Sequence, residues 1–267
     1  FAWRNSYNFR YTIIAGLLCI ISVSRIDEPF ALMPVGEVNK ENFAEAFSAL
    51  KGYFKAKGWR FIFKKILKEE LNYFRGSVSS EKSIVYDREN SDYLYKTADL
   101  INLKGKKFDG KRNHLNKFKK QHSYEYVIID QTLVGECLKI MEDWCKGRDC
   151  SCQYGEYCEK YANTQILSNF NTLGCKGALI KVDGVFEAFT AGEMLNDDTA
   201  VIHIEKANGS INGLYPLINQ QFAAMEWSGT AYINREQDLG IEGMRKAKMS
   251  YHPEMLVDKY TVYPDKI

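Results

Sequence analysis

The second half of the chain alternates regularly between strand-like and helix-like apolar patterns. Residues 177–182 and 185–194 are apolar runs separated by Asp183 and Gly184, the strongest short-range signal for a β-hairpin. Around this hairpin, the periodicity predicts helices over 132–145, 154–174, 213–227 and 239–251, and strands over 199–208, 230–234 and 257–263. The predicted order is helix, helix, three strands, helix, strand, helix, strand.

The first half contains a similar but less regular mixture. Phe43, Phe47, Leu50 and Phe54 share one face at helical spacing, which predicts a helix over 39–58. The other elements that we predict here are two buried strands joined by a turn over 13–23, strands over 59–63, 83–87 and 124–130, and helices over 64–74, 91–103 and 111–121.

The element order predicts the fold class. The order in the second half is typical of the acyltransferase fold built around an acetyl-CoA-binding sheet, the GNAT fold. A chain of 267 residues exceeds the usual size of one core, which favours two domains. We therefore predict an α/β (α+β) protein of two tandem GNAT-like acyltransferase domains with mixed central sheets, divided into 1–122 and 123–267. The duplication rests on element order, because no exact internal repeat is visible.

The composition is that of a soluble globular protein, with 45% apolar residues, 26% charged residues and a formal net charge of +2. The longest apolar run, over 13–23, is too short to span a bilayer and is broken by Gly16. No signal peptide is recognisable. We expect a cytoplasmic protein without a transmembrane segment, and no feature of the sequence defines its oligomeric state.

One stretch is strongly basic. Residues 103–120 carry seven Lys, one Arg and one Asp, a local net charge of +7. Leu115 and Phe118 share one face of the helix in this stretch, and the charged side chains expected around its other side are Lys111, Arg112, Lys119 and Lys120. A solvated helix face is one interpretation. The other is a phosphate-binding surface for tRNA or a phospholipid surface, and its candidate residues are Lys104, Lys106, Lys107 and Arg112.

Four of the seven cysteines form a cluster with the spacing C-x4-C-x-C-x5-C, namely Cys145, Cys150, Cys152 and Cys158. Structural zinc sites usually contain paired C-x2-C spacings. The spacing therefore favours reduced thiols over a metal site. We predict no metal ligands and no required cofactor.

Three stretches carry a family resemblance: LINLKGKKFDGKRNHLNKF (100–118), HIEKANGSINGLYPLINQQFA (203–223) and YINREQDLGIEGMRKAKMSYHPEMLVDKY (232–260). They resemble soluble bacterial proteins related to the C-terminal domain of phosphatidylglycerol lysyltransferase. The resemblance implies two GNAT-like domains, and more distant kinship with Fem-type peptidyltransferases. The membrane-bound relatives move an amino acid from aminoacyl-tRNA onto a lipid head group. Their multi-span membrane region has no counterpart in this sequence, so the resemblance supports the transferase fold more than a lipid acceptor.

The strand predicted over 199–208 carries candidate catalytic groups. Strict alternation sends His203 and Glu205 to one face and Lys206 to the other. A His and a carboxylate on a buried strand are costly unless they are paired or hydrated, so they are candidates for general base catalysis. The alternative is a structural pair that bridges to a cation such as Arg235 or Lys246. Lys206 and the following loop, with Asn208 and Gly209, are candidates for phosphate binding, although such a loop is more often a simple turn.

The end of the strand over 230–234 is a second candidate region, because ligands bind at strand ends in α/β folds. Asn234 could hydrogen-bond a substrate carbonyl, and Arg235 could bind a phosphate or carboxylate. Lys246 and Lys248 follow on the next helix as further binding candidates, and Tyr251 is a candidate proton donor. We expect Asp238 to cap that helix.

Three functional hypotheses follow. The first is transfer of an amino acid from aminoacyl-tRNA to an amine or hydroxyl acceptor, with tRNA as partner and a lipid head group at a membrane surface among the possible acceptors. The second is an acyl-CoA-dependent N-acyltransferase, and the third is a non-catalytic binding protein on the same fold. Fold alone does not decide between them.

Overall fold

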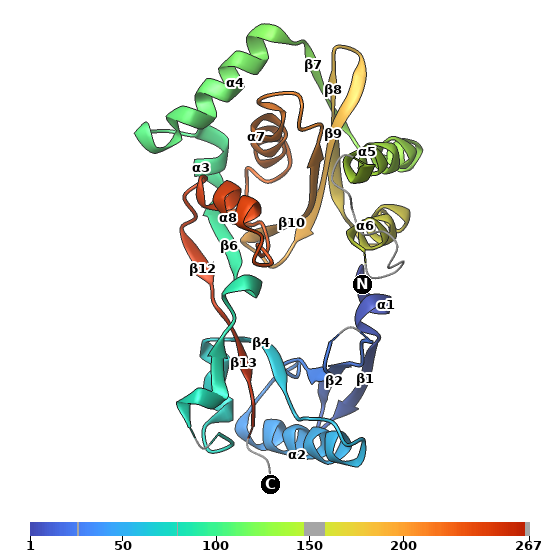
Figure 1. Ribbon diagram of the computed structural model, residues 1–267, viewed down its shortest axis with the longest axis vertical. Coiled ribbons are helices and arrows are strands. Elements are labelled where there is room, and N and C mark those ends of the chain that lie inside the picture. Colours follow the sequence, from blue (N-terminus) through green and yellow to red (C-terminus); the bar gives the residue numbers. More distant parts are fainter. Residues whose placement is uncertain (26, 79, 147–157, 265–267) are drawn as a thin grey trace. The chain divides into compact units, whose positions relative to one another are not determined.

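The computed structural model describes residues 1–25, 27–78, 80–146 and 158–264. The chain divides into two compact units (Figure 1). Unit 1 comprises Phe1–Ala2 and Asp92–Leu256, and unit 2 comprises Trp3–Ser91 and Val257–Ile267. Each unit has its own sheet and its own hydrophobic core.

Unit 1 is built around a seven-stranded mixed sheet with the order β12-β6-β11-β10-β9-β8-β7. Its strands are β6 (Asp92–Lys96), β7 (Tyr124–Ile128), β8 (Lys176–Val182), β9 (Val185–Met194), β10 (Thr199–Ala207), β11 (Tyr232–Asn234) and β12 (Met255–Val257). Its α-helices are α3 (Thr97–Asn102), α4 (Asp109–Gln121), α5 (Val134–Lys146), α6 (Glu159–Ser168), α7 (Leu214–Glu226) and α8 (Glu242–Met249). Short 3-10 helices occupy Lys106–Phe108 and Gln131–Leu133.

The pairing of β10 with β11 is parallel. Thr199 lies opposite Tyr232, and Val201 lies opposite Asn234. The neighbouring pairs β7–β8, β8–β9, β9–β10 and β11–β6 are antiparallel. The β10–β11 ladder ends at Val201, although β10 continues to Ala207. The two strands therefore separate at the carboxyl end of β11, which is where ligands bind in open α/β sheets.

Helices cover both faces of this sheet (Figure 1). Ile202 of β10 belongs to the hydrophobic cluster that includes Phe118 of α4 and Leu217 of α7. Ile204 belongs instead to the cluster that includes Met141 of α5. Two residues of one strand that are two positions apart thus pack on opposite faces, which a regular strand does not allow.

Unit 2 contains a six-stranded mixed sheet with the order β1-β2-β3-β4-β13-β5. Its strands are β1 (Phe9–Ile14), β2 (Leu17–Ser22), β3 (Phe30–Ala31), β4 (Phe63–Leu67), β5 (Ile84–Tyr86) and β13 (Lys259–Val262). Its helices are α1 (Arg4–Tyr7) and α2 (Lys40–Ala56), with 3-10 helices over Glu69–Phe74, Glu81–Ser83 and Arg88–Asn90. The apolar face of α2 packs on the sheet, and Asn39 and Asn42 form a capping box at its start.

Both units repeat one arrangement, which confirms the predicted tandem GNAT-like architecture. Three antiparallel strands lead through a helix to a strand parallel to the third: β8-β9-β10-α7-β11 in unit 1 and β1-β2-β3-α2-β4 in unit 2. The next strand in each sheet comes from a distant part of the chain. The strand β6 pairs with β11, and the late strand β13 pairs with β4.

This exchange of strands explains why the units do not follow the expected division into 1–122 and 123–267. The expected boundary falls inside unit 1, between α4 and β7. The strand β6 and the helices α3 and α4, which we placed in an N-terminal domain, pack with the later elements of unit 1. The C-terminal strand β13, which we placed in the second domain, belongs to unit 2.

Of the helices predicted in the first half, the one over 64–74 is wrong and the one over 91–103 is correct only in its second part. The stretch 64–74 forms most of β4 and a 3-10 helix, and the strand expected over 59–63 lies later, at Phe63–Leu67. The stretch 91–103 begins as β6, because Tyr93 and Tyr95 alternate inward with exposed or half-buried neighbours, and becomes helical only at Thr97. Of the two strands expected to be buried over 13–23, β2 is buried and β1 is mostly exposed.

Candidate active site

The candidate site lies where β10 continues beyond the end of β11. The pairing of β10 with β9 shifts register between Ile202 and Ile204, which leaves His203 as an extra residue in a β-bulge. The bulge interrupts the alternation of side chains. His203 and Glu205, which we expected on a shared face, accordingly have different partners.

A buried ion pair forms the centre of the site. Nη2 of Arg235, directly after β11, lies 2.8 Å from Oε1 of Glu205 on β10, and the two side chains are only 12% and 13% exposed. Nδ2 of Asn219 on α7 donates to the other carboxylate oxygen of Glu205 at 3.0 Å. The structural pairing of Glu205 with Arg235, one of our two interpretations, is therefore present.

Two buried polar atoms beside this ion pair lack hydrogen-bond partners among the described residues. They are Nη1 of Arg235 and Oδ1 of Asn219. The Tyr251 hydroxyl approaches the guanidinium, yet it does not satisfy Nη1. Because nearly all buried polar atoms in proteins are hydrogen-bonded, two such atoms at one ion pair indicate a place where water or a ligand binds.

The turn after β11 holds Arg235 in position. Nζ of Lys248 donates to the carbonyl oxygens of Arg235 at 2.5 Å, Glu236 at 3.2 Å and Gln237 at 2.6 Å. Oδ1 of Asn234 accepts from the amide of Glu236 at 2.7 Å. Burial and the positive charge of Arg235 lower the pKa of Lys248 to about 8. Asn234 and Lys248, expected to contact substrate, are thus engaged in bracing this turn.

Aromatic rings line the buried cations. The guanidinium carbon of Arg235 lies 4.9 Å from the ring centre of Tyr251 and 5.7 Å from that of Tyr95. Nζ of Lys111 on α4 lies 4.0 Å from the ring centre of Tyr251. Burial raises the pKa of Tyr251 despite the nearby Arg235, so the phenol stays neutral. A neutral phenol keeps its proton for a hydrogen bond but is a weak proton donor.

The sequence analysis placed Lys111 on the solvent-facing side of its helix, and the structure corrects this position. Lys111 is half-buried against the site instead. Burial and the charge of Arg235 lower the pKa of Lys111 to about 8. An appreciable fraction of this amine is therefore neutral near physiological pH.

His203 lies between two carboxylates. Its Nδ1 is 2.8 Å from Oε1 of Glu236, and its Nε2 is 2.9 Å from Oε1 of Glu193 on β9. Burial opposes the charged imidazolium, but the two carboxylates outweigh it and raise the pKa of His203. With both ring nitrogens donating to carboxylates, the protonated form is favoured, and this geometry does not support a general base at His203.

The loop between β10 and α7 is a self-contained turn. Oδ1 of Asn208 accepts from the amide and hydroxyl of Ser210, and the amide of Ile211 donates to the carbonyl of Asn208. Gly213 has a φ of +92°, and a Cβ there would lie 2.6 Å from the carbonyl oxygen of His114 on α4. The start of α7 therefore packs closely on α4, and much of the loop's hydrogen-bonding capacity is already used.

The predicted phosphate-binding residues of this loop face an acidic environment. Asn208 and Gly209 line a hollow whose other lining residues are Ile140, Asp143, Trp144, Phe186, Glu187, Ala207 and Ser210. Lys206 is buried, and its Nζ lies 2.8 Å from Glu159 and 3.5 Å from the ring centre of Trp144. These contacts differ from those of the cluster formed by Arg235, Glu205 and Asn219, so Lys206, Asn208 and Gly209 are not part of that cluster.

The basic stretch 103–120 divides into three groups. Lys107 pairs with Asp99 at 3.1 Å, and Arg112 pairs with Asp109 and donates to the carbonyl oxygens of Leu103 and Gly105. Lys111 points toward the site. The exposed cations that form no ion pair with any described residue are Lys104, Lys106, Lys117, Lys119 and Lys120.

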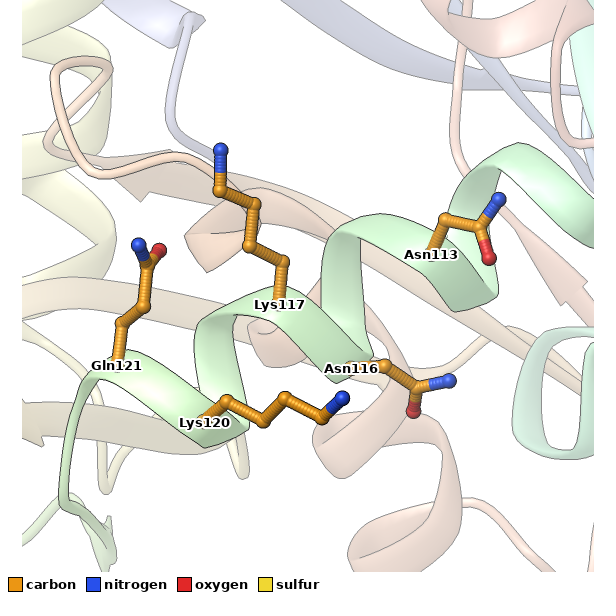
Figure 2. Close-up of a pocket in the computed structure, with 5 residues that line it drawn as sticks. All are labelled: Asn113, Asn116, Lys117, Lys120 and Gln121. Carbon is orange, nitrogen blue, oxygen red and sulfur yellow. The ribbon is translucent and has the colours of Figure 1, made fainter.

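Figure 2 shows part of this exposed surface on α4. Asn113, Asn116, Lys117, Lys120 and Gln121 line a shallow hollow, and all five come from the one helix. Their side chains extend in different directions from it (Figure 2). A single helix cannot enclose a small molecule, so this is an open basic surface rather than a small-molecule pocket.

Other predicted features lie outside the cluster. Lys246 is exposed on α8, and α8 has no side-chain cap, because the buried Asp238 binds Arg245 and the hydroxyl of Tyr93 instead. Cys150 and Cys152 lie outside the described residues. In the described part of the chain, no group of three or more His, Cys, Asp or Glu side chains could hold a metal ion.

Sequence reasoning identified Arg235, Glu205 and Tyr251 but missed the residues that complete the site. Asn219 was hidden in an amphipathic helix, although a buried Asn on an apolar face was a signal that could have been weighed. Glu193 and Glu236 became relevant only through the bulge at His203.

The fold and the position of the site define the class of protein. The chain has the fold of tandem GNAT proteins, and a tandem GNAT protein of the clavulanic acid biosynthesis pathway superposes over 94% of this chain and 80% of its own, with a TM-score of 0.52 at 7% identity. FemX has the same fold at 9% identity, with a TM-score of 0.59 over 98% of this chain and 89% of its own.

Within this class, the chain belongs to the family described as phosphatidylglycerol lysyltransferase, C-terminal, whose model matches residues 1–263. Membership of this family fits an aminoacyltransferase. The match also agrees with the resemblance that the three sequence stretches carry.

Three individual relatives can be compared with the chain. A conserved protein of unknown function from Bacteroides thetaiotaomicron is 34% identical, with a TM-score of 0.89 over 99% of this chain and 88% of its own. L-PGS from Bacillus licheniformis is 16% identical, with a TM-score of 0.66 over 97% of this chain and 85% of its own. An uncharacterised protein from Mycoplasmoides gallisepticum is 25% identical over 180 residues, which span 67% of this chain but only 58% of that relative.

No helix in the described part of this chain has the length and apolar character needed to cross a bilayer.

Proposed function

We propose that this protein is an aminoacyltransferase that moves an amino acid from aminoacyl-tRNA to an amine or hydroxyl acceptor. The observation that carries the proposal is the buried cluster of Arg235, Glu205 and Asn219 at the point where β10 and β11 separate. Family membership over residues 1–263 supports the reaction class. The cluster combines fixed charges with unsatisfied polar atoms, as a site for a polar substrate requires.

In the proposed reaction, the nitrogen or oxygen of the acceptor attacks the ester carbonyl of aminoacyl-tRNA. A tetrahedral oxyanion forms and then collapses, the ester bond breaks, and the ribose oxygen of the tRNA leaves with the proton that the acceptor loses. Arg235 supplies positive charge near the oxyanion, and the braced turn at Lys248 keeps Arg235 in place.

Two observations favour tRNA as the donor over acyl-CoA. The exposed lysines Lys104, Lys106, Lys117, Lys119 and Lys120 give an extended cationic surface that suits a polyanion. The loop before α7, which was a candidate for phosphate binding, has its Asn208, Ser210 and Ile211 amides already bonded within the protein. The acceptor is an amine or a hydroxyl, and a lipid head group is one candidate for it.

The test is a transfer assay with a complete mixture of radiolabelled aminoacyl-tRNAs. The protein is incubated with phospholipid vesicles or with a soluble amine extract, and label is followed into lipid-soluble and water-soluble products. Transfer that Arg235→Gln abolishes, while tRNA binding persists, is the expected result. Binding of aminoacyl-tRNA without transfer to any acceptor would indicate a binding protein, and transfer from acetyl-CoA alone would replace the proposal with an acyltransferase.

A further inference from the structure

We propose that Arg235 and Lys111 form a subsite for an anionic oxygen of a substrate, supplied by a phosphate or a carboxylate. Of the basic residues in the stretch 103–120, we place only Lys111 in this subsite. Nη1 of Arg235 is buried and has no partner among the described residues, so it is a donor available to a ligand. Lys111 contacts the same tyrosine ring as Arg235, at 4.0 Å and 4.9 Å from its centre.

The balance of charge at the subsite favours an anion. Arg235 and Lys111 are two cations, and Glu205 is the carboxylate that neutralises Arg235. Both oxygens of Glu205 are already engaged, one by Arg235 and the other by Asn219. Buried charges are unfavourable unless they are paired. The carboxylate that acts on Lys111 is this same Glu205, so a bound anion would give Lys111 a negative partner of its own.

The other neighbouring carboxylates are engaged elsewhere. Glu236 and Glu193 both bind His203. Tyr251 is a neutral phenol, because burial raises its pKa. Lys248 is a further cation nearby. Its Nζ donates to carbonyl oxygens, and the carboxylates of Glu236, Glu205 and Asp92 act on its charge.

The unpaired Oδ1 of Asn219 limits which ligands fit the subsite. Nδ2 of Asn219 must face Glu205, because a carboxylate oxygen only accepts hydrogen bonds. Oδ1 is therefore an acceptor that is buried without a partner in the described structure. A ligand with a hydroxyl or amine next to its anionic group satisfies both Asn219 and Arg235. A phosphodiester at the end of tRNA and the phosphate of a lipid head group both have adjacent hydroxyls.

Lys139 on α5 supplies a matched control for Lys111. It is exposed, lies 3.9 Å from Glu136, and belongs neither to the basic stretch 103–120 nor to the subsite. Removal of either lysine side chain changes the net charge equally. Only Lys111 is at the buried subsite, and Lys139→Met is therefore the control for Lys111→Met.

The inference depends on the proposed function for its biological use, but its test does not require the transfer reaction. Inorganic phosphate and acetate are titrated into the full-length protein by calorimetry. We expect saturable phosphate binding that weakens at least tenfold in Lys111→Met and remains unchanged in Lys139→Met. Absence of saturable binding of either anion, or equal weakening in both variants, would overturn the subsite.

Two ligands then distinguish the sources of the phosphate. The trinucleotide cytidylyl-cytidylyl-adenosine represents the tRNA end, and glycerol 3-phosphate represents a lipid head group. The ligand that shows the larger Lys111-dependent affinity identifies the source. In the same samples, NMR of labelled lysine side chains follows the Lys111 amine, whose pKa of about 8 should rise when an anion binds. A pKa of Lys111 unaffected by saturating ligand would contradict direct contact.

The two proposals fail in different ways. Lys111-dependent anion binding without any aminoacyl transfer would leave the subsite intact and remove the transferase function. Aminoacyl transfer that is equally fast in Lys111→Met and Lys139→Met, without anion binding, would leave the transferase function intact and remove the subsite.

Discussion

Removal of the carboxylate of Glu205 tests whether the Arg235–Glu205 pair is as buried as the structure indicates. Glu205→Gln keeps the side-chain volume but leaves the charge of Arg235 without its counter-ion. Breaking a buried ion pair by neutralising one partner costs about 3–5 kcal/mol in the free energy of unfolding. Because both side chains are nearly nine-tenths buried, we expect a loss within this range.

The measurement is urea unfolding followed by circular dichroism and by hydrogen exchange of the β10 amides, which reports on unit 1 separately. Asp99→Asn is the control, because it removes the exposed Lys107–Asp99 pair on the same unit, and exposed pairs contribute about 0–1 kcal/mol. The double variant Glu205→Leu/Arg235→Leu removes both charges and should regain much of the lost stability. A loss of less than about 1 kcal/mol in Glu205→Gln would refute the reasoning, since it would mean that the pair is hydrated.

Three further predictions test other parts of the structure. Gly213→Ala should lower the free energy of unfolding by about 2 kcal/mol or more, because the added Cβ would meet the backbone of α4 and the residue has a positive φ. Gly209→Ala is the control, since a Cβ there would lie in open space and should change the free energy of unfolding little. Thermal unfolding compares the two variants. The pKa of His203 is raised in the folded state, so the ion pairs of this residue stabilise the fold fully below the unfolded pKa of about 6.5. That stabilisation is lost as the pH rises through the folded pKa. Between pH about 6 and about 9, urea titrations should therefore show a larger loss of stability for the wild type than for His203→Gln. Truncation after Leu256 removes β13 from between β4 and β5, and limited proteolysis should then cleave unit 2 while sparing unit 1.

The parts of the fold that local signals specify could be predicted from the sequence. The hairpin at Asp183 and Gly184 and the helix over 39–58 follow from turn chemistry and apolar spacing, and both are present. The strand Asp92–Lys96 was read as the start of a helix, because its pairing partner β11 lies far along the chain. Long-range pairing overrides local propensity, which is also why the boundary between the units could not be located from the order of elements.

Prediction from local sequence signals has the same limit for single side chains of the candidate site. Alternation along a strand holds only while the register is regular, and the bulge at His203 gives this residue and Glu205 separate partners. Helical periodicity likewise placed Lys111 with the solvated lysines, although its aliphatic stem can lie along the protein while its amine reaches Tyr251. Charge density alone therefore does not identify a functional lysine. What distinguishes Lys111 is its position against a second buried cation, where its positive charge is unfavourable until an anion is bound.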